Sequence, residues 1–134
     1  MGISQHDFNE MTRRVAAARK TPVAPPEAVN DEGKLHLAII DFCERQFPRW
    51  KYRHARMDRP TTEEKGIEDF TVFMPNGITA HVECKKKSGK QSVDQLAWQL
   101  ELGRLGHKVY VVFSIEQFKA LADELLQNAK NPSI

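Results

Sequence analysis

The spacing of hydrophobic residues predicts two helices in the first third of the chain. Within residues 31–47 the apolar side chains recur every three or four positions, as Leu35, Ile39, Phe42 and Cys43. This period is typical of a helix with one buried face, and Pro48 would end it. An Ala-rich stretch over residues 4–20, with Ser4 at the N-cap position, predicts an earlier helix.

A proline-rich segment separates these two helices. Its three prolines are Pro22, Pro25 and Pro26. Proline interrupts both helices and strand ladders, so we expect residues 1–26 to form a basic helical arm with a linker. Residues 27–134 would then form the compact domain, since 134 residues leave room for one domain of ordinary size.

The rest of the chain predicts four strands and two more helices. Aromatic and basic residues alternate over 50–55, which indicates a half-buried strand. Strands over 67–74 and 78–86 flank a Pro-Asn-Gly turn. The continuously apolar residues 108–113 are typical of a strand in the middle of a sheet.

Two Ser-x-x-Gln patterns mark the starts of the remaining helices. Ser92 and Gln95 form a capping-box pattern before a helix that ends near Leu105, and Ser114 begins a helix to about Ala129. The last strand follows a helical crossover and should lie parallel to the strand before it. The predicted fold class is α/β, with a mixed central sheet of about four strands flanked by helices.

The hairpin register follows from keeping apolar residues opposite one another. A three-residue loop sets Phe70 opposite Val82, whereas a two-residue loop would set Phe70 opposite Glu83. We take the three-residue register, in which Gly77 supplies the left-handed residue.

That register predicts two carboxylates opposite one another. Asp69 would lie across from Glu83, with Lys85 on the same face as Glu83. Like charges so placed destabilise a sheet, unless a divalent cation binds them. Hard oxygen ligands suit Mg²⁺ or Mn²⁺, and Lys85 would hold a phosphate or orient a water for phosphodiester hydrolysis. The alternative is a solvated polar face on which Lys85 neutralises Glu83.

Charge and composition narrow the class of partner. The net charge is only +2, but Lys and Arg gather within residues 11–20, 45–60 and 85–90. Basic clusters indicate a polyanion such as nucleic acid, although each cluster alone is also compatible with a solvated face. No apolar run reaches the ~20 residues of a membrane helix, and no secretory signal is evident at the N-terminus. We therefore expect a cytoplasmic protein with no membrane partner.

The cysteines and histidines are not expected to carry chemistry. Cys43 and Cys84 are too few for a disulfide scaffold and should lie in the core. His36 and His107 have no partner at metal-ligand spacing, and His81 is a single histidine on a strand.

Short motifs follow one another in a distinctive order along residues 32–125. They are Gly66-Ile67-Glu68-Asp69, Glu83-Cys84-Lys85, Gly89 with Ser92-Val93-Asp94-Gln95, and Gly106 before an apolar strand. Together they resemble the VRR-NUC family of the PD-(D/E)XK nuclease superfamily. The resemblance implies a restriction-endonuclease-like core and DNA hydrolysis with Mg²⁺ or Mn²⁺, without an organic cofactor. This chain departs at Glu68, where the family usually has proline, which leaves the choice of metal open.

The resemblance also implies individual roles. The metal ligands would be Glu32, Asp69, Glu83 and the backbone carbonyl of Cys84. Lys85 would be the catalytic lysine, and Gln95 would lie near the active site unless it serves only the capping box. Glu32 is preferred to Glu27 as the helical ligand, because its distance from the helix's apolar residues matches the family.

DNA as partner gives the basic residues a role. The expected DNA contacts are Arg49, Lys51, Arg53, Arg56, Arg59, Lys86, Lys87 and Lys90, through salt-dependent contacts to phosphates. Trp50 and Tyr52 are expected in the core rather than under stacked bases. Analogy with small phage or prophage nucleases implies a homodimer that cuts branched or junction DNA. A less selective endonuclease or an exonuclease acting on duplex DNA is the alternative.

Two readings from other classes stay open. The chain would be a non-catalytic nucleic-acid-binding module if the fold had lost its chemistry, although Asp69, Glu83 and Lys85 are all present. It would be an interaction module of a replication or packaging assembly if the arm docked a partner. An arm folded onto the isolated domain would argue against that second reading.

Overall fold

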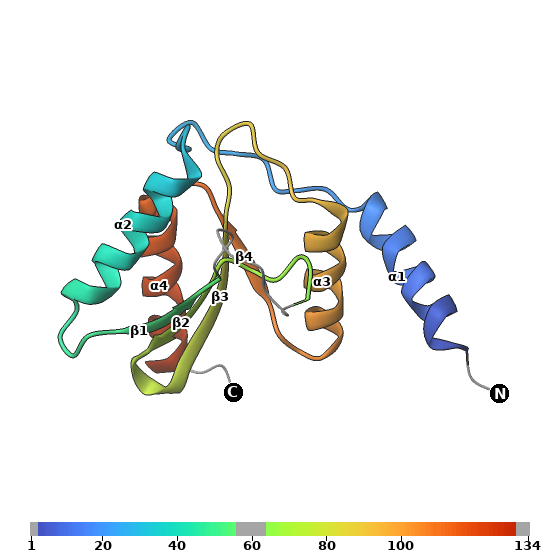
Figure 1. Ribbon diagram of the computed structural model, residues 1–134. Coiled ribbons are helices and arrows are strands. Elements are labelled where there is room, and N and C mark those ends of the chain that lie inside the picture. The colour runs from blue at the N-terminus through green and yellow to red at the C-terminus, as the bar shows by residue number, and fades with distance from the viewer. Residues whose placement is uncertain (1–2, 56–63, 131–134) are drawn as a thin grey trace.

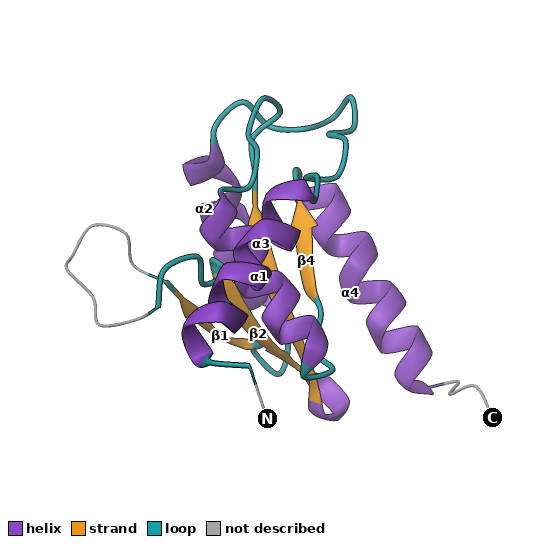
Figure 2. Ribbon diagram, turned by 90° about the vertical axis from the view of Figure 1, so that its right-hand side faces the viewer, coloured by secondary structure: helices purple, strands orange, loops and turns teal. Residues whose placement is uncertain are grey.

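A computed structural model describes residues 3–55 and 64–130. Its elements are α1 (Gln5–Ala18), α2 (Glu32–Arg45), β1 (Lys51–His54), β2 (Phe70–Met74), a 3₁₀ turn (Pro75–Gly77), β3 (Ile78–Cys84), α3 (Val93–Arg104), β4 (Val109–Val112) and α4 (Ile115–Lys130). One face of the sheet is covered by α2 and α4 and the other by α3, with α1 outside α3 (Figures 1 and 2). Within those ranges every helix is too short or too polar to cross a membrane.

The strands form one mixed sheet in the order β1-β2-β3-β4. β2 and β3 pair antiparallel with Phe70 opposite Val82, which confirms the predicted hairpin register. Asn76 and Gly77 adopt left-handed backbone conformations in the loop, with φ of 64° and 73°. β4 lies parallel to β3, as its helical crossover predicts. The expected α/β class with a mixed sheet flanked by helices is confirmed.

Several details of the predicted elements are wrong, among them the end of β3, which lies at Cys84 rather than at Lys86. β4 lies at the edge of the described sheet rather than in its middle, and it is apolar because α3 and α4 contact it from the two sides. β2 begins at Phe70, where its ladder with β3 ends, although the Asp69 carbonyl still accepts a hydrogen bond of 2.8 Å from the Ala55 N–H beyond β1. α2 ends at Arg45, two residues early, since the residue before Pro48 disfavours helical geometry.

The main core lies between the sheet and the α2–α4 pair. α2 contributes three buried residues to it: Leu35, Ile39 and Cys43. β3 contributes Val82 and Cys84, so both cysteines lie in the core as expected. Trp50 is buried in the core, as expected, whereas Tyr52 is only partly buried and packs against the same cluster.

α1 packs on α3 and does not extend freely from the domain. Thr12 and Ala16 are buried on its inner face, and Arg13 Nη1 lies 2.7 Å from Asp94 Oδ1. The proline linker then crosses the end of the sheet toward α2 (Figure 1). The folded arm argues against a module that docks a partner through a free N-terminal segment.

Candidate functional site

Glu83 is a carboxylate buried on the α3 side of the sheet. Its side chain is 2% exposed, and Gln91 Nε2 donates a hydrogen bond of 2.5 Å to Glu83 Oε2. Burial raises the pKa of Glu83 from its ordinary 4.5 to about 7, because desolvation disfavours the charged form. A carboxyl group whose pKa is so perturbed is a candidate for function rather than for stability.

The charges of the predicted site residues converge at the end of β3. The ammonium group of Lys85 lowers the pKa of Glu83, whereas the carboxylates of Asp69 and Glu32 raise it. The same acidic groups, after burial, raise the pKa of the Cys84 thiol. Several carboxylates around one buried strand end repel each other, and a divalent cation would relieve that repulsion.

Asp69 reaches this strand end by a route that the sequence did not predict. The β2–β3 ladder stops one residue short of it, so Asp69 and Glu83 do not form a cross-strand pair. The chain bends at Asp69, and Asp69 Oδ2 accepts a hydrogen bond of 2.7 Å from the Cys84 N–H. The prediction that Asp69 and Glu83 form a cross-strand pair is therefore wrong, although Asp69 still raises the pKa of Glu83.

Glu32 begins α2 and lies against the loop that follows β3. Its Oε1 accepts a hydrogen bond of 3.2 Å from the Lys86 N–H. A Cβ at Gly89 would lie 3.1 Å from that oxygen, so the glycine permits the close approach. The first turn of a helix also favours a carboxylate through the helix dipole.

Lys85 is buried beside Glu83 and is 8% exposed. Its backbone N–H donates to the Val112 carbonyl at 3.0 Å, which continues the pairing with β4 past the end of β3. A buried ammonium group requires a compensating negative charge, and Glu83 is such a group.

The sequence offered two roles for Gln95, in a capping box or near the active site, and in the structure two different glutamines make these contacts. The Gln95 side chain accepts a hydrogen bond of 2.9 Å from the Ser92 N–H, and the Gln95 N–H donates to Ser92 Oγ at 3.1 Å. This is the predicted capping box. Gln91 is the residue that contacts Glu83, and its Nε2 also donates to Gln99 Oε1 at 2.8 Å. Sequence reasoning missed Gln91 because it lies in a loop and belongs to no motif.

Glu68 is buried on the α3 side and turned away from Asp69. Its Oε2 accepts a hydrogen bond of 2.8 Å from Trp98 Nε1, and its Oε1 lies 3.4 Å from His81 Nδ1. The preceding turn lies tightly on the start of α3, because a Cβ at Gly66 would fall 2.2 Å from the Asp94 carbonyl oxygen.

His36 lies at the site, which corrects the prediction that it has no metal-spaced partner. Its Nε2 is 3.6 Å from Asp69 Oδ2, and its Nδ1 is 2.8 Å from His54 Nε2. His36 follows Glu32 by four residues, so the two share one face of α2. This spacing was visible in the sequence, but the contact with β1 was not.

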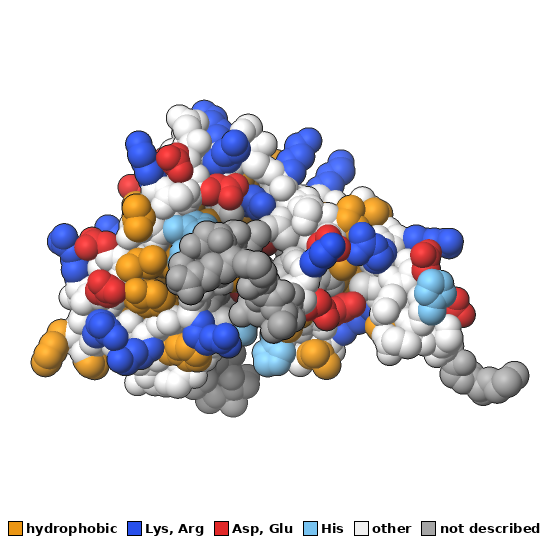
Figure 3. Space-filling view, viewed as in Figure 1, with side chains coloured by type: hydrophobic (Ala, Val, Ile, Leu, Met, Phe, Trp, Pro, Cys, Tyr) orange, Lys and Arg blue, Asp and Glu red, His pale blue; other side chains and the backbone are white. Residues whose placement is uncertain are grey.

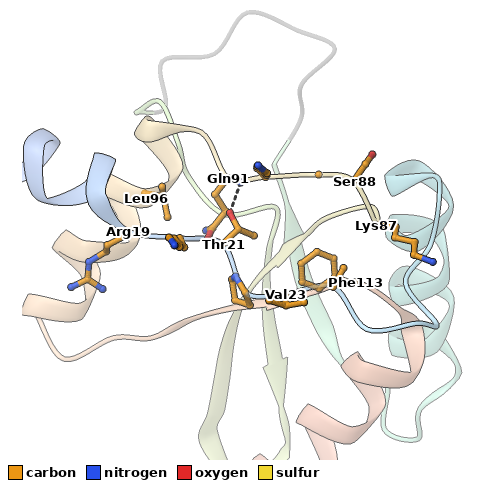
Figure 4. A pocket seen from close by; sticks show the side chains of 13 residues that line it. Arg19, Thr21, Val23, Lys87, Ser88, Gln91, Leu96 and Phe113 are labelled. Carbon is orange, nitrogen blue, oxygen red and sulfur yellow. Dashed lines mark hydrogen bonds between the residues drawn. The ribbon is translucent and has the colours of Figure 1, made fainter.

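A basic cavity of about 580 Å³ lies beside Gln91 (Figure 4). It opens between the proline linker and the loop after β3, which are joined by a 2.7 Å hydrogen bond from the Gln91 N–H to Thr21 Oγ1. Its described lining includes no acidic residue and four basic ones: Arg19, Lys20, Lys87 and Lys90. Figure 3 shows Lys and Arg side chains gathered over the end of the molecule where these segments lie.

The predicted DNA contacts fall on two edges of the molecule. Lys87 and Lys90 line the cavity, and Lys86 is exposed next to them. Three exposed residues lie along or just before β1, which is an edge strand of the sheet: Arg49, Lys51 and Arg53. Arg56 and Arg59 lie outside the described residues.

Comparisons with models of protein families, with curated proteins and with solved structures find no match to this chain. The function is therefore inferred from the chemistry of the chain's own residues. Carboxylates, a buried ammonium group and a neighbouring basic cavity together form an arrangement suited to a cation and a phosphate-bearing polymer.

Proposed function

We propose that this protein is a metal-dependent nuclease that hydrolyses phosphodiester bonds in DNA, in the manner that the resemblance to the VRR-NUC family implies. One observation carries the proposal: Glu83 is a carboxylate 2% exposed, with the charges of Lys85, Asp69 and Glu32 all acting on it. Burying so many charged groups together costs folding free energy. The same groups can bind a metal ion and a phosphate, which a phosphodiester hydrolase requires.

The donor set suits Mg²⁺ or Mn²⁺. Glu32, Asp69 and Glu83 would hold the ion together with the backbone carbonyl of Cys84, which supplies the oxygen ligands that these ions prefer. When bound, such an ion polarises a phosphodiester and makes water more acidic.

The protein side chains supply position and charge. The ammonium group of Lys85 orients a water or a phosphate oxygen beside Glu83. Gln91 holds Glu83 Oε2 by a hydrogen bond of 2.5 Å and so restricts its rotamer. Cys84 is fully buried and its thiol pKa is raised, so direct attack by water is favoured over a covalent enzyme intermediate.

The basic cavity supports DNA as the substrate. Its four cationic side chains lie next to Gln91, one hydrogen bond away from Glu83. Such contacts bind phosphates regardless of sequence and weaken with salt. The proposal includes branched or junction DNA as the substrate and a homodimer as the acting form.

A cleavage assay tests the proposal. Labelled linear duplex, flap and four-way-junction DNA would be incubated with Mg²⁺, Mn²⁺ or EDTA, for wild type, Lys85→Ala and Asp69→Asn. We expect cuts that require a divalent ion and that both variants abolish, because each variant removes a charge from the strand end. The preferred substrate then distinguishes a junction or flap nuclease from a less selective one.

Glu68→Gln is the matched control. Glu68 is also a buried carboxylate on the α3 side, but it binds Trp98, so this variant should still cut DNA. DNA binding without any cleavage, equal in all four proteins, would contradict the catalytic proposal. It would leave a non-catalytic nucleic-acid-binding module.

A further inference from the structure

His36 presents a buried nitrogen that has no hydrogen-bond partner among the described residues. This atom, Nε2, lies 3.6 Å from Asp69 Oδ2, which is too far for a hydrogen bond. A buried polar atom left without a partner costs folding free energy. A cation bound between the His36 nitrogen and the Asp69 oxygen would give both atoms a partner.

A third donor lies close to this pair. One ligand atom each from His36, Asp69 and Cys84 all lie within 4.8 Å of one another. The three donors are an imidazole nitrogen, a carboxylate oxygen and a thiol sulfur, drawn from α2, the residue before β2 and the end of β3. Nitrogen and sulfur donors suit Zn²⁺ and similar ions, whereas Mg²⁺ selects oxygen.

The surroundings hold His36 in the orientation of a metal ligand. Its Nδ1 lies 2.8 Å from His54 Nε2. With the proton on Nδ1, His36 donates to His54 and leaves the lone pair of its Nε2 directed at Asp69. A hydrogen bond from the second nitrogen fixes the tautomer and the ring orientation of a metal-binding histidine. The His54 ring is itself fixed by stacking on Phe70, with centroids 4.4 Å apart and planes at 7°.

We infer that His36, Asp69 and Cys84 form a site for a borderline-soft divalent ion of the Zn²⁺ class. The ion draws the three ligand atoms closer together and completes its coordination with water. The Cys84 thiol loses its proton to solvent on binding, as zinc-binding cysteines do. The side chains of His36 and Asp69 are 18% and 15% exposed, so the ion reaches the site from solvent.

Asp69 belongs to both this site and the proposed Mg²⁺ or Mn²⁺ site. A Zn²⁺-class ion therefore competes for a carboxylate that the nuclease needs, and it inhibits cleavage. This regulatory consequence rests on the proposed function, whereas the binding of the ion does not.

Co²⁺ is the probe for binding, because its visible absorption reports coordination and its thiolate bonds give a separate near-ultraviolet band. The full chain would be titrated with Co²⁺ alone, without DNA. We expect both absorptions for wild type. His36→Asn should weaken Co²⁺ binding by about tenfold or more, and Cys84→Ser should remove the thiolate band.

Cys43→Ser is the matched control. Cys43 is another fully buried thiol of the same core, so its variant loses a similar packing contact but should keep the thiolate band. Circular dichroism would show that each variant folds. If Cys84→Ser is unfolded, the change in Co²⁺ affinity of His36→Asn alone tests the proposed site.

The outcomes for the two proposals are separable. Absence of Co²⁺ absorption, or equal absorption in wild type, His36→Asn and Cys84→Ser, would overturn the zinc-class site even if Mg²⁺-dependent cleavage occurs. Co²⁺ binding lost in His36→Asn supports the site even if no DNA is cut. Zn²⁺ inhibition of cleavage that disappears in His36→Asn would support both proposals.

Discussion

The two faces of β3 are buried to a similar degree but carry opposite chemistry. On the α2–α4 face, Val82 and Cys84 are fully buried, and on the α3 side Glu83 is 2% and Lys85 8% exposed. Each buried methylene stabilises the fold by about 0.8 kcal/mol, whereas each buried charge costs several kcal/mol unless it is compensated. Burial is therefore similar on the two faces, but only the α3 side carries the charged residues that the proposed site uses.

The same division runs along α2. Leu35, Ile39 and Cys43 of this helix are buried in the core. Glu32 and His36, four residues apart, instead contact the loop after β3 and Asp69. One helix therefore anchors the fold and delivers two polar groups to the strand ends, which couples the position of the site to the packing of the core.

Replacing Glu83 is expected to have the largest effect on the difference between the two faces of β3. Glu83→Gln should slow metal-dependent cleavage by about 10³-fold or more, because loss of a metal ligand costs several kcal/mol of transition-state stabilisation. The same variant should unfold at no lower urea concentration at pH 8, because the raised pKa of Glu83 shows that its ionised form destabilises the fold relative to its neutral form even with Lys85 beside it. Cleavage rates and urea denaturation of one sample would show both effects. A parallel loss of activity and stability would contradict the division between the two faces.

The close approach of Gly66 to α3, in the turn before β2, can be tested by substitution. Gly66→Ala should destabilise the protein by about 3 kcal/mol, because its φ of 88° is strained for alanine and the new Cβ would lie 2.2 Å from the Asp94 carbonyl oxygen. Gly103→Ala is the control, because no described atom lies within 4 Å of its Cβ. That variant should gain up to about 1 kcal/mol from helix propensity. Equal denaturation midpoints for the two variants would refute the close approach at Gly66.

The pH dependence of stability separates the faces in another way. Burial raises the pKa of Glu83 from 4.5 to about 7, so between these values the folded chain holds a proton that the unfolded chain has lost. The free energy of unfolding should therefore fall as pH rises through this window, by at most about 3 kcal/mol. Urea denaturation in EDTA at pH 5 and pH 8 would measure it, with Glu83→Gln showing the smaller fall. The same fall in both proteins would rule out Glu83 as its source.

The smallest effect is expected on the apolar face. Val82→Ala should lower the free energy of unfolding by about 2 kcal/mol, from lost burial and a small cavity. Its cleavage rate should stay within a few-fold of wild type under conditions where the variant is folded. Thermal denaturation and the junction-cleavage assay would measure the two quantities. A large loss of activity in the folded variant would show that the two faces are not independent.

The sequence predicted most of the fold because the local signals agree with one another. The three-residue hairpin register followed from the match of Phe70 to Val82, and the capping box followed from Ser92 and Gln95. The apolar residues of β4 correctly predicted a strand but wrongly placed it in the middle of the sheet. They are apolar because helices contact the strand from both sides.

The candidate site was less predictable because its contacts come from bends and loops. Asp69 lies where the ladder ends, and its partner there is a backbone N–H that no side-chain pattern reveals. Gln91 lies in a loop, and His36 meets His54 only through packing of a helix against a strand. Sequence spacing describes residues within one element, so contacts between elements needed the structure.

Binding of Mn²⁺ without DNA is the most direct test of the central claim, that the polar end of β3 holds a divalent ion. Electron paramagnetic resonance would follow the loss of the free Mn²⁺ signal at pH 8, for wild type, Glu83→Gln and Glu68→Gln. We predict stoichiometric binding by wild type and Glu68→Gln, with binding to Glu83→Gln weaker by about tenfold or more. Equal binding by wild type and Glu83→Gln, or none by either, would contradict the account.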